Sequence, residues 1–273
     1  MPKHAYRFRG QIQPTAEVKR PVRAELVAET DGTVGKLYLH DVIDSWGGFW
    51  GISAAEFNAA LAELGDVEQI NLHINSPGGE VYEGIAITNA LRRHSAKVTA
   101  IVDGLAASAA SFIAAGVDEL VMGRNTELMI HDAWGIALGP EADVRAAADR
   151  LGKISNNIAG MYADKAGGTP ESWREFMLAE TWYSDAEAVA AGLADRIEGD
   201  DEEEPADPDA FASAFDLSVF KSAGRMAAPA PCLDVSNNET PGLTVDQSAR
   251  ERRQRQNRNR LNLARQRATA VPR

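Results

Sequence analysis

Segments with two different apolar periodicities alternate along the chain from about residue 24 to residue 197. In residues 69–75 (QINLHIN), apolar and polar residues come close to alternating, which is typical of β-strands. In residues 53–64 apolar residues recur at helical spacing, and Ser53 stands where an N-cap is expected. Strands are predicted at 35–43, 69–75, 97–103, 119–123 and 127–133, and helices at 53–64, 79–94, after Gly104, at 140–167 and at 185–197, the last running into a final strand. This alternation predicts an α/β fold.

The composition is typical of a globular protein. The 273 residues are 44% hydrophobic and 25% charged, which is the range of folded domains. No apolar run approaches the ~20 residues of a membrane span, and residues 1–13 lack the apolar stretch of a secretory signal peptide. Cys232 is the one cysteine, which excludes an internal disulfide framework and a multi-cysteine metal site. We therefore expect a cytoplasmic protein that uses no metal or cofactor.

The net charge of −12 conceals two blocks of opposite sign near the C-terminus. Residues 198–209 (EGDDEEEPADPD) contain eight acidic residues and no basic ones, whereas residues 250–273 contain nine arginines and one glutamate. Such blocks are typical of disordered or interaction segments. The predicted regions are an N-terminal segment (1–23), a folded domain (24–198) and a largely disordered acidic linker and arginine-rich tail (199–273).

Two parts of this tail are candidates for binding a partner. Residues 209–224 (DAFASAFDLSVFKSAG) gather phenylalanines and aliphatic residues, which fits either a docking peptide that folds on a partner or a plain linker. The arginine-rich residues 250–273 can bind nucleic acid through phosphate charge. An acidic assembly partner, or the chain's own acidic run, fits these arginines equally well.

Two glycine-containing turns are candidates for binding an anion. Residues 75–79 (NSPGG) follow a predicted strand and open a predicted helix, and Gly78 and Gly79 permit backbone angles that other residues resist. Residues 103–108 (DGLAAS) repeat the order of strand, glycine, tight turn and helix. Such turns present amide N–H groups outward. On neighbouring parallel strands they would lie side by side at the carboxyl ends of the sheet.

Residues 102–116 (VDGLAASAASFIAAG) contain two serines among small residues. Either one serine heads the helix as a nucleophile, or both fill space in a buried helix. A serine nucleophile needs a base within hydrogen-bond reach, and the base needs a carboxylate to orient it. His131 closes a predicted strand before a glycine-containing loop, whereas His73 and His94 fit structural roles better. Serine, histidine and a later acid therefore occur in an order that can form a triad.

Four segments together carry a family resemblance. INLHINSPGGEVYEGIAI, VDGLAASAASFIAAG, LMIHDAWG and YSDAEAVAAGLADRI resemble, in the same order, the proteolytic subunit of the Clp protease. They are most similar to the divergent branch that tailed bacteriophages and prophages use as head-maturation proteases. The resemblance covers roughly residues 34–198. It implies a ClpP/crotonase-type superhelix of repeated β-β-α units and the activity of a serine endopeptidase.

The resemblance also implies roles for individual residues. Ser108 corresponds to the family's nucleophile and His131 to its general base, while Ser111 lies one helical turn further on, where the family has a small packing residue. The oxyanion hole is implied at the backbone N–H groups of Gly79 and Ala109. Residues 140–167 correspond to the handle helix that joins rings in the family, which implies a ring-shaped homo-oligomer.

The third member of the triad is where this sequence departs from the family. The Clp subunit has an aspartate at the position of Glu180, and glutamate is one methylene longer but can also orient an imidazole. Asp185 is a competitor, although it lies where a helix N-cap is expected. Asp132 follows the histidine directly, and its side chain should point the other way from a strand. A dyad without any acid is a further alternative.

The substrates that the resemblance implies are capsid, scaffold or portal proteins, cleaved during head maturation in the host cytoplasm or within the procapsid. For a maturation protease, the chain's own tail is a further candidate substrate of Ser108. Two alternatives stay open: a host-type subunit working with an ATP-dependent unfoldase, and a non-catalytic scaffold for capsid assembly. The chain has no Gly-x-x-x-x-Gly-Lys-Ser/Thr loop, so ATP use would belong to a partner. Crotonases share the superfold but use acidic catalysts, and related signal peptide peptidases use a serine–lysine dyad.

Overall fold

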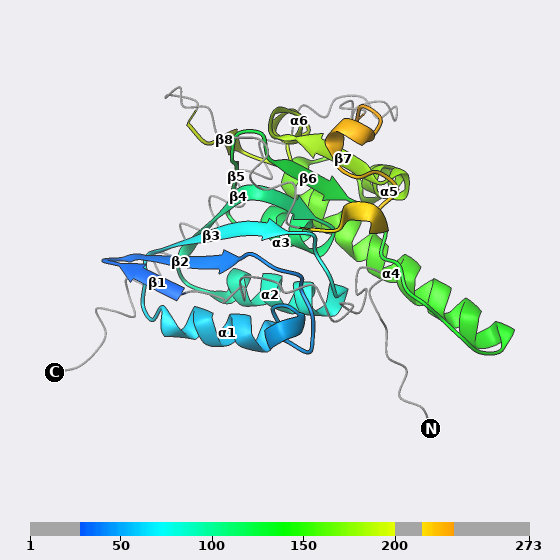
Figure 1. The fold of residues 1–273 in the computed structure, drawn as a ribbon, viewed down its shortest axis with the longest axis horizontal. Coiled ribbons are helices and arrows are strands. Elements are labelled where there is room, and N and C mark those ends of the chain that lie inside the picture. Colours follow the sequence, from blue (N-terminus) through cyan, green and yellow to red (C-terminus); the bar gives the residue numbers. More distant parts are fainter. Residues whose placement is uncertain (1–27, 200–214, 232–273) are drawn as a thin grey trace.

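The computed structural model describes residues 28–199 and 215–231, in which one sheet is combined with six α-helices (Figure 1). The strands are β1 (Ala28–Asp31), β2 (Val34–Leu39), β3 (Gln69–Ser76), β4 (Lys97–Ala107), β5 (Glu119–Met122), β6 (Glu127–Ile130), β7 (Thr181–Ser184) and β8 (Arg196–Ile197). The α-helices are α1 (Ala54–Glu63), α2 (Val81–Arg93), α3 (Ala109–Ala115), α4 (Glu141–Ala166), α5 (Pro170–Ala179) and α6 (Asp185–Ala190). Short 3-10 helices are η1 (Gly48–Trp50), η2 (Leu217–Val219) and η3 (Arg225–Ala227). The predicted α/β class is confirmed.

The sheet divides at β4. Its main path runs β1-β2-β3-β4-β5-β8, with parallel pairing throughout except between β1 and β2. The first part of β4, Thr99–Val102, pairs with β5, whereas its last part, Leu105–Ala107, pairs in parallel with β6. Strand β7 then pairs antiparallel with β6. The division places the ends of β4 and β6 beside each other.

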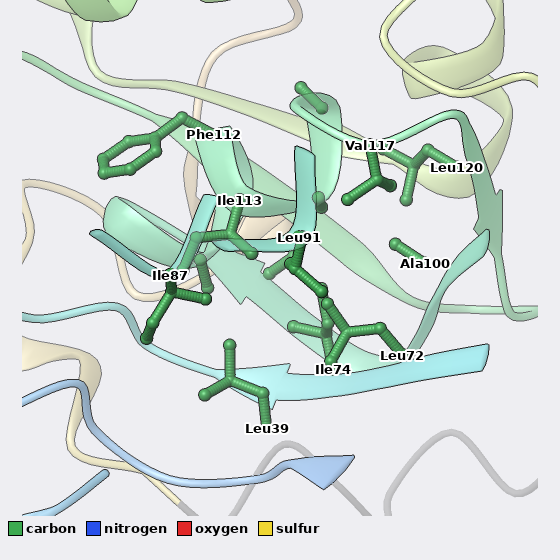
Figure 2. Close-up of a cluster of buried hydrophobic side chains, with 14 of the residues drawn as sticks. Leu39, Leu72, Ile74, Ile87, Leu91, Ala100, Phe112, Ile113, Val117 and Leu120 are labelled. Atoms are coloured by element: carbon green, nitrogen blue, oxygen red, sulfur yellow. The ribbon is translucent and has the colours of Figure 1, made fainter. Parts of the chain in front are cut away.

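The main core lies between the sheet and its helices. Alternate residues of β3, Ile70, Leu72 and Ile74, are fully buried, as the period of two predicts. Figure 2 shows Leu72 and Ile74 close to side chains of α2 and α3, among them Leu91 and Ile113. Helices α1 and α2 lie below the sheet in the view of Figure 1.

Local capping explains several helix boundaries. Ser53 is the N-cap of α1 and forms a capping box with Glu56, which confirms the predicted helix start. Helix α6 has Ser184 as its N-cap, with a capping box to Glu187, so Asp185 is the first helical residue and the N-cap expected there was one residue off. The sequence pattern did not predict α5, β7 or β1. No helix in the described part of the chain is long and apolar enough to cross a membrane.

Residues 215–231 pack against the domain, and we call them the strap. Their composition placed them in the predicted tail, where residues 209–224 were one candidate for a docking peptide. Phe220 of the strap forms a second apolar cluster whose other fully or nearly buried members are Leu105, Ala107, Met129 and Trp182. The N-terminal segment, most of the acidic run, Cys232 and the arginine-rich residues 250–273 lie outside the described residues.

Candidate active site

Ser108 lies in the turn that joins β4 to α3. Strand β4 continues through Gly104 to Ala107, so the turn occurs at Ser108 itself and not, as the sequence suggested, after the glycine. Ser108 has φ 53° and ψ −119°, which L-residues adopt rarely and at a cost in strain. Its N–H donates a hydrogen bond of 2.9 Å to the carbonyl of Met129. The turn therefore resembles the strained strand-to-helix elbow that carries the nucleophilic serine of α/β-hydrolases.

His131 directly follows β6 and meets Ser108 across the division of the sheet. Because Ala107 and Met129 are register partners in β4 and β6, the residues just beyond them emerge at the same edge. The Ser108 Oγ and His131 Nε2 atoms are 2.7 Å apart. With the ring proton on Nδ1, the hydroxyl donates to Nε2, which is the geometry that a general base requires. The sequence predicted this pair, and the structure brings the two side chains together.

The surroundings of His131 keep its ring uncharged at neutral pH. Burial lowers its pKa to about 4, the negative charge of Glu180 opposes this shift, and the positive charge of Lys221 adds to it. An uncharged imidazole has a free lone pair on Nε2, so it can accept the serine proton.

Glu180 is buried close to this pair. It ends α5 in a left-handed conformation with φ 59°, and only 8% of the residue is exposed. Its Oε1 atom accepts a hydrogen bond of 3.0 Å from the Ser222 N–H and lies 3.5 Å from Trp182 Nε1. Within the described residues no hydrogen bond joins Glu180 to His131, so its influence on the ring is electrostatic.

The two competing acids are engaged elsewhere. Asp132 accepts from Arg174 Nη2 at 2.6 Å, consistent with a side chain that points away from the histidine. Asp185 accepts from the backbone N–H groups of Asn125 at 2.9 Å and Ala186 at 2.7 Å. The charge that acts on the His131 ring from a nearby acid is that of Glu180.

The two glycine-containing turns lie side by side, as predicted. A Cβ on Gly78 would lie 2.5 Å from the Ala107 carbonyl oxygen and 2.7 Å from Ser108 Cβ. Gly79 has φ +151°, and its Cβ would lie 1.9 Å from the carbonyl oxygen of Ile43. In the described structure no hydrogen bond is formed by the N–H of Gly79 or of Ala109. Both amides are therefore available to an incoming oxygen atom near Ser108.

Ser111 occupies a different environment from Ser108. It is fully buried, and its hydroxyl donates to the Ser108 carbonyl at 2.6 Å. The same oxygen lies 2.7 Å from the Tyr162 hydroxyl of α4. These contacts tie α3 to α4, which matches the packing role expected for this serine.

Sequence reasoning missed three residues around the site. These residues are Phe220, Lys221 and Ser222 of the strap. They lie near His131 or Glu180, although they come after the domain predicted at 24–198. The cluster of phenylalanines at residues 209–224 was a signal that this part of the tail binds something. The cluster did not indicate against which surface this segment packs.

Comparison with known proteins identifies the family. Residues 53–201 match the family described as Clp protease. The chain is 32% identical over 139 residues to the ATP-dependent Clp protease proteolytic subunit of Pleurastrum terricola, spanning 50% of this chain and 71% of the relative. It is 34% identical over 134 residues to the subunit of the same name from Leuconostoc citreum, spanning 48% of this chain and 67% of the relative. The chain belongs to the Clp protease family.

Membership of the Clp protease family makes the chain a serine endopeptidase, a hydrolase of peptide bonds. This favours the peptidase over the crotonase alternative and over the non-catalytic scaffold. In the part of the chain that the structure describes, no group of three or more histidine, cysteine or acidic side chains is arranged to hold a metal ion.

Proposed function

We propose that Ser108 is the nucleophile of this Clp-type peptidase, His131 its general base and Glu180 the acid that stabilises the charged imidazole. The observation that carries the proposal is the distance of 2.7 Å between Ser108 Oγ and His131 Nε2. It is supported by the uncharged state of the ring, whose pKa is about 4. The amides of Gly79 and Ala109 are proposed to hold the oxyanion.

In this mechanism the Ser108 oxygen forms a bond to the peptide carbonyl carbon while its proton moves to His131 Nε2. The carbonyl oxygen becomes an oxyanion, which the two amide N–H groups stabilise. Loss of one such donor costs roughly 3–4 kcal/mol in the barrier of a serine hydrolase. The imidazolium then gives its proton to the leaving amine as the C–N bond breaks. Water, deprotonated by His131, finally hydrolyses the acyl-enzyme and restores the serine.

A fluorophosphonate probe tests the proposed nucleophile. The wild-type chain, Ser108→Ala and Ser111→Ala are each treated with the probe and measured by intact mass. We expect one adduct on wild type and on Ser111→Ala, and none on Ser108→Ala. Labelling lost only in Ser111→Ala would move the nucleophile one turn along α3, and an unlabelled wild-type chain would contradict the proposed mechanism.

For the biological role, we propose cleavage of capsid, scaffold or portal proteins during phage head maturation. The proposal is supported by the similarity of the four sequence motifs to that branch and by the charged extension after the catalytic domain. The second candidate is a subunit that works with an unfoldase, because the relatives are named ATP-dependent. Hydrolysis of a folded capsid precursor by the purified chain, without an ATPase, separates the two. No cleavage unless an ATP-driven unfoldase is added would favour the second.

A further inference from the structure

The strap contacts the candidate triad at two of its three members. The ring of Phe220 stands edge-on to the His131 ring, with centroids 5.6 Å apart and an interplanar angle of 86°. Two residues later, the N–H of Ser222 donates to the Glu180 carboxylate at 3.0 Å. Both contacts come from a segment that lies beyond the domain predicted at 24–198. What these contacts do for the site is a different question from which residue is the nucleophile.

Phe220 is the apolar anchor of the strap. It is 8% exposed and lies against Leu105 and Ala107 of β4, Met129 of β6 and Trp182 of β7. Register pairs Ala107 with Met129 and Met129 with Trp182, so these residues share the sheet face opposite the main core. The sheet thus offers an apolar socket directly beneath the triad, and Phe220 fills it. The Trp182 and Phe220 rings meet at 77° with centroids 5.7 Å apart.

Charged side chains hold the strap just after this anchor. Lys221 Nζ donates to the Leu178 carbonyl at 2.9 Å. The Arg225 guanidinium binds the Glu187 carboxylate through two nitrogens, with Nη2 to Oε1 at 2.7 Å, and lowers the pKa of Glu187 to about 2. The Arg225 backbone N–H donates to Glu127 at 3.1 Å. Bidentate arginine–carboxylate pairs fix geometry more strictly than single contacts do.

The contact at Glu180 has a direct chemical consequence. An N–H donor restricts the orientation of the carboxylate that it binds. In the described residues the Ser222 N–H makes the shortest hydrogen bond to this carboxylate, since Trp182 Nε1 lies at the outer limit of 3.5 Å. The orientation of Glu180 relative to the ring therefore depends on a residue 42 positions further along the chain.

The strap supports the site without occupying it. A segment that blocked the enzyme as a pseudo-substrate would disturb the serine–histidine contact or bind the oxyanion amides. The contact is intact at 2.7 Å, and in the described structure neither the Gly79 nor the Ala109 N–H is hydrogen-bonded by the strap. We propose that the strap is a positioning element for the triad, in which Ser222 orients Glu180 and Phe220 packs His131 in place. This inference rests on the proposed function of Ser108, His131 and Glu180.

The sharpest test removes one hydrogen-bond donor from the backbone. Ser222→Pro deletes the N–H that binds Glu180, whereas the matched control Ser222→Ala keeps it. Each variant of the full chain is reacted with the fluorophosphonate probe over a range of probe concentrations. We expect Ser222→Pro to lower the maximal labelling rate about tenfold or more with unchanged probe affinity, because Glu180 would lose the donor that orients it beside the His131 ring. Ser222→Ala should stay within about twofold of wild type on both measures.

A second set of variants guards against a folding defect in the proline variant. Phe220→Ala empties the socket, and Phe220→Leu refills most of it, while Met226→Ala changes a strap residue that is 99% exposed. We expect a slower maximal rate for Phe220→Ala, substantial recovery for Phe220→Leu and no change for Met226→Ala, with thermal unfolding measured alongside.

The outcomes separate the two proposals. A wild-type chain that is not labelled at Ser108 contradicts the proposed function. A labelled wild type together with Ser222→Pro and Phe220→Ala variants that react at the wild-type rate overturns only the positioning role. Faster labelling of these variants, or a change confined to probe affinity, would mean that the strap obstructs the substrate site and would equally overturn it.

Discussion

At the scale of single residues, Gly79 is required by two constraints at once. Its φ of +151° is unfavourable for any side chain, and a Cβ would lie 1.9 Å from the Ile43 carbonyl oxygen. That oxygen accepts the Glu80 N–H at 2.9 Å, which holds the turn beside Ser108. The sequence predicted a turn with outward amides at Gly78 and Gly79 from their place between strand and helix, because glycine is the residue type that such backbone angles favour.

We expect Gly79→Ala to lower the fluorophosphonate labelling rate by about 100-fold or more, because the clash with Ile43 would displace the turn and move the proposed oxyanion donor out of position. Gly65→Ala is the matched control, since Gly65 has φ +65° but open space around it. It should cost about 1–2 kcal/mol of stability from backbone strain and leave labelling unchanged. Labelling of Gly79→Ala at the control's rate would remove this turn from the mechanism.

His131 predicts a dependence of stability on pH. Its pKa is lowered to about 4 in the folded protein, below the ordinary 6.5, so the unfolded chain binds more protons between these values. The stabilisation is complete above pH 6.5 and is lost as the pH falls towards 4. Between pH 6.5 and 5 we expect wild type to lose about 1–2 kcal/mol more than His131→Gln. Denaturant unfolding at both pH values measures the difference, and equal losses would contradict the shift.

At the scale of elements, helices with local signals were predicted to within a few residues. The capping box of Ser53 and Glu56 defines the start of α1 in four letters of sequence. Helix α5 carries similar letters, with Thr169 as N-cap and Pro170 at its first position, and was overlooked although the signal was present. Strand β7 has four residues and becomes a strand only through its pairing with β6, which no local pattern reveals.

Helices α2 and α3 approach each other closely at Gly84. A Cβ on Gly84 would lie 2.7 Å from Phe112 Cζ and 3.3 Å from Ala109 Cβ, next to the nucleophile's turn. We expect Gly84→Ala to destabilise the protein by about 1–3 kcal/mol through overpacking. Gly160→Ala in α4 meets nothing within 4 Å and should be stabilising by up to about 1 kcal/mol. Thermal unfolding of both variants measures these changes in stability. A change in the same direction for both variants would contradict the prediction.

At the scale of the whole molecule, α4 extends well past the sheet (Figure 1). Its first turns are mostly exposed, including Val144 at 42%. The family resemblance implies that this helix joins subunits, and a projecting helix fits that role. If it does, Val144→Glu should shift the protein to smaller assemblies in mass photometry, while the exposed control Met226→Glu should not. Identical mass distributions would place the subunit contacts elsewhere.

The placement of the strap marks the part of the site that could not be predicted from sequence. Ser108 and His131 could be picked out by resemblance because each lies within a short contiguous motif, DGLAAS and MIH. Ser222 contacts Glu180 from 42 positions further along the chain, and no local pattern links the two positions. The socket for Phe220 is built from residues of three strands, among them Leu105, Met129 and Trp182. It therefore forms only when β6 pairs with both β4 and β7.

The position of the strap in the sequence also determines when the site is completed during synthesis. A ribosome adds roughly 5–20 residues per second, and domains fold from the N-terminus as they emerge. The 42 residues between Glu180 and Ser222 therefore take roughly 2–8 s to synthesise at that speed. During this interval the nascent chain has its serine and histidine but not the segment that steadies its acid. If the strap positions the triad as proposed, the site is complete only after residue 222 of the 273 has been synthesised.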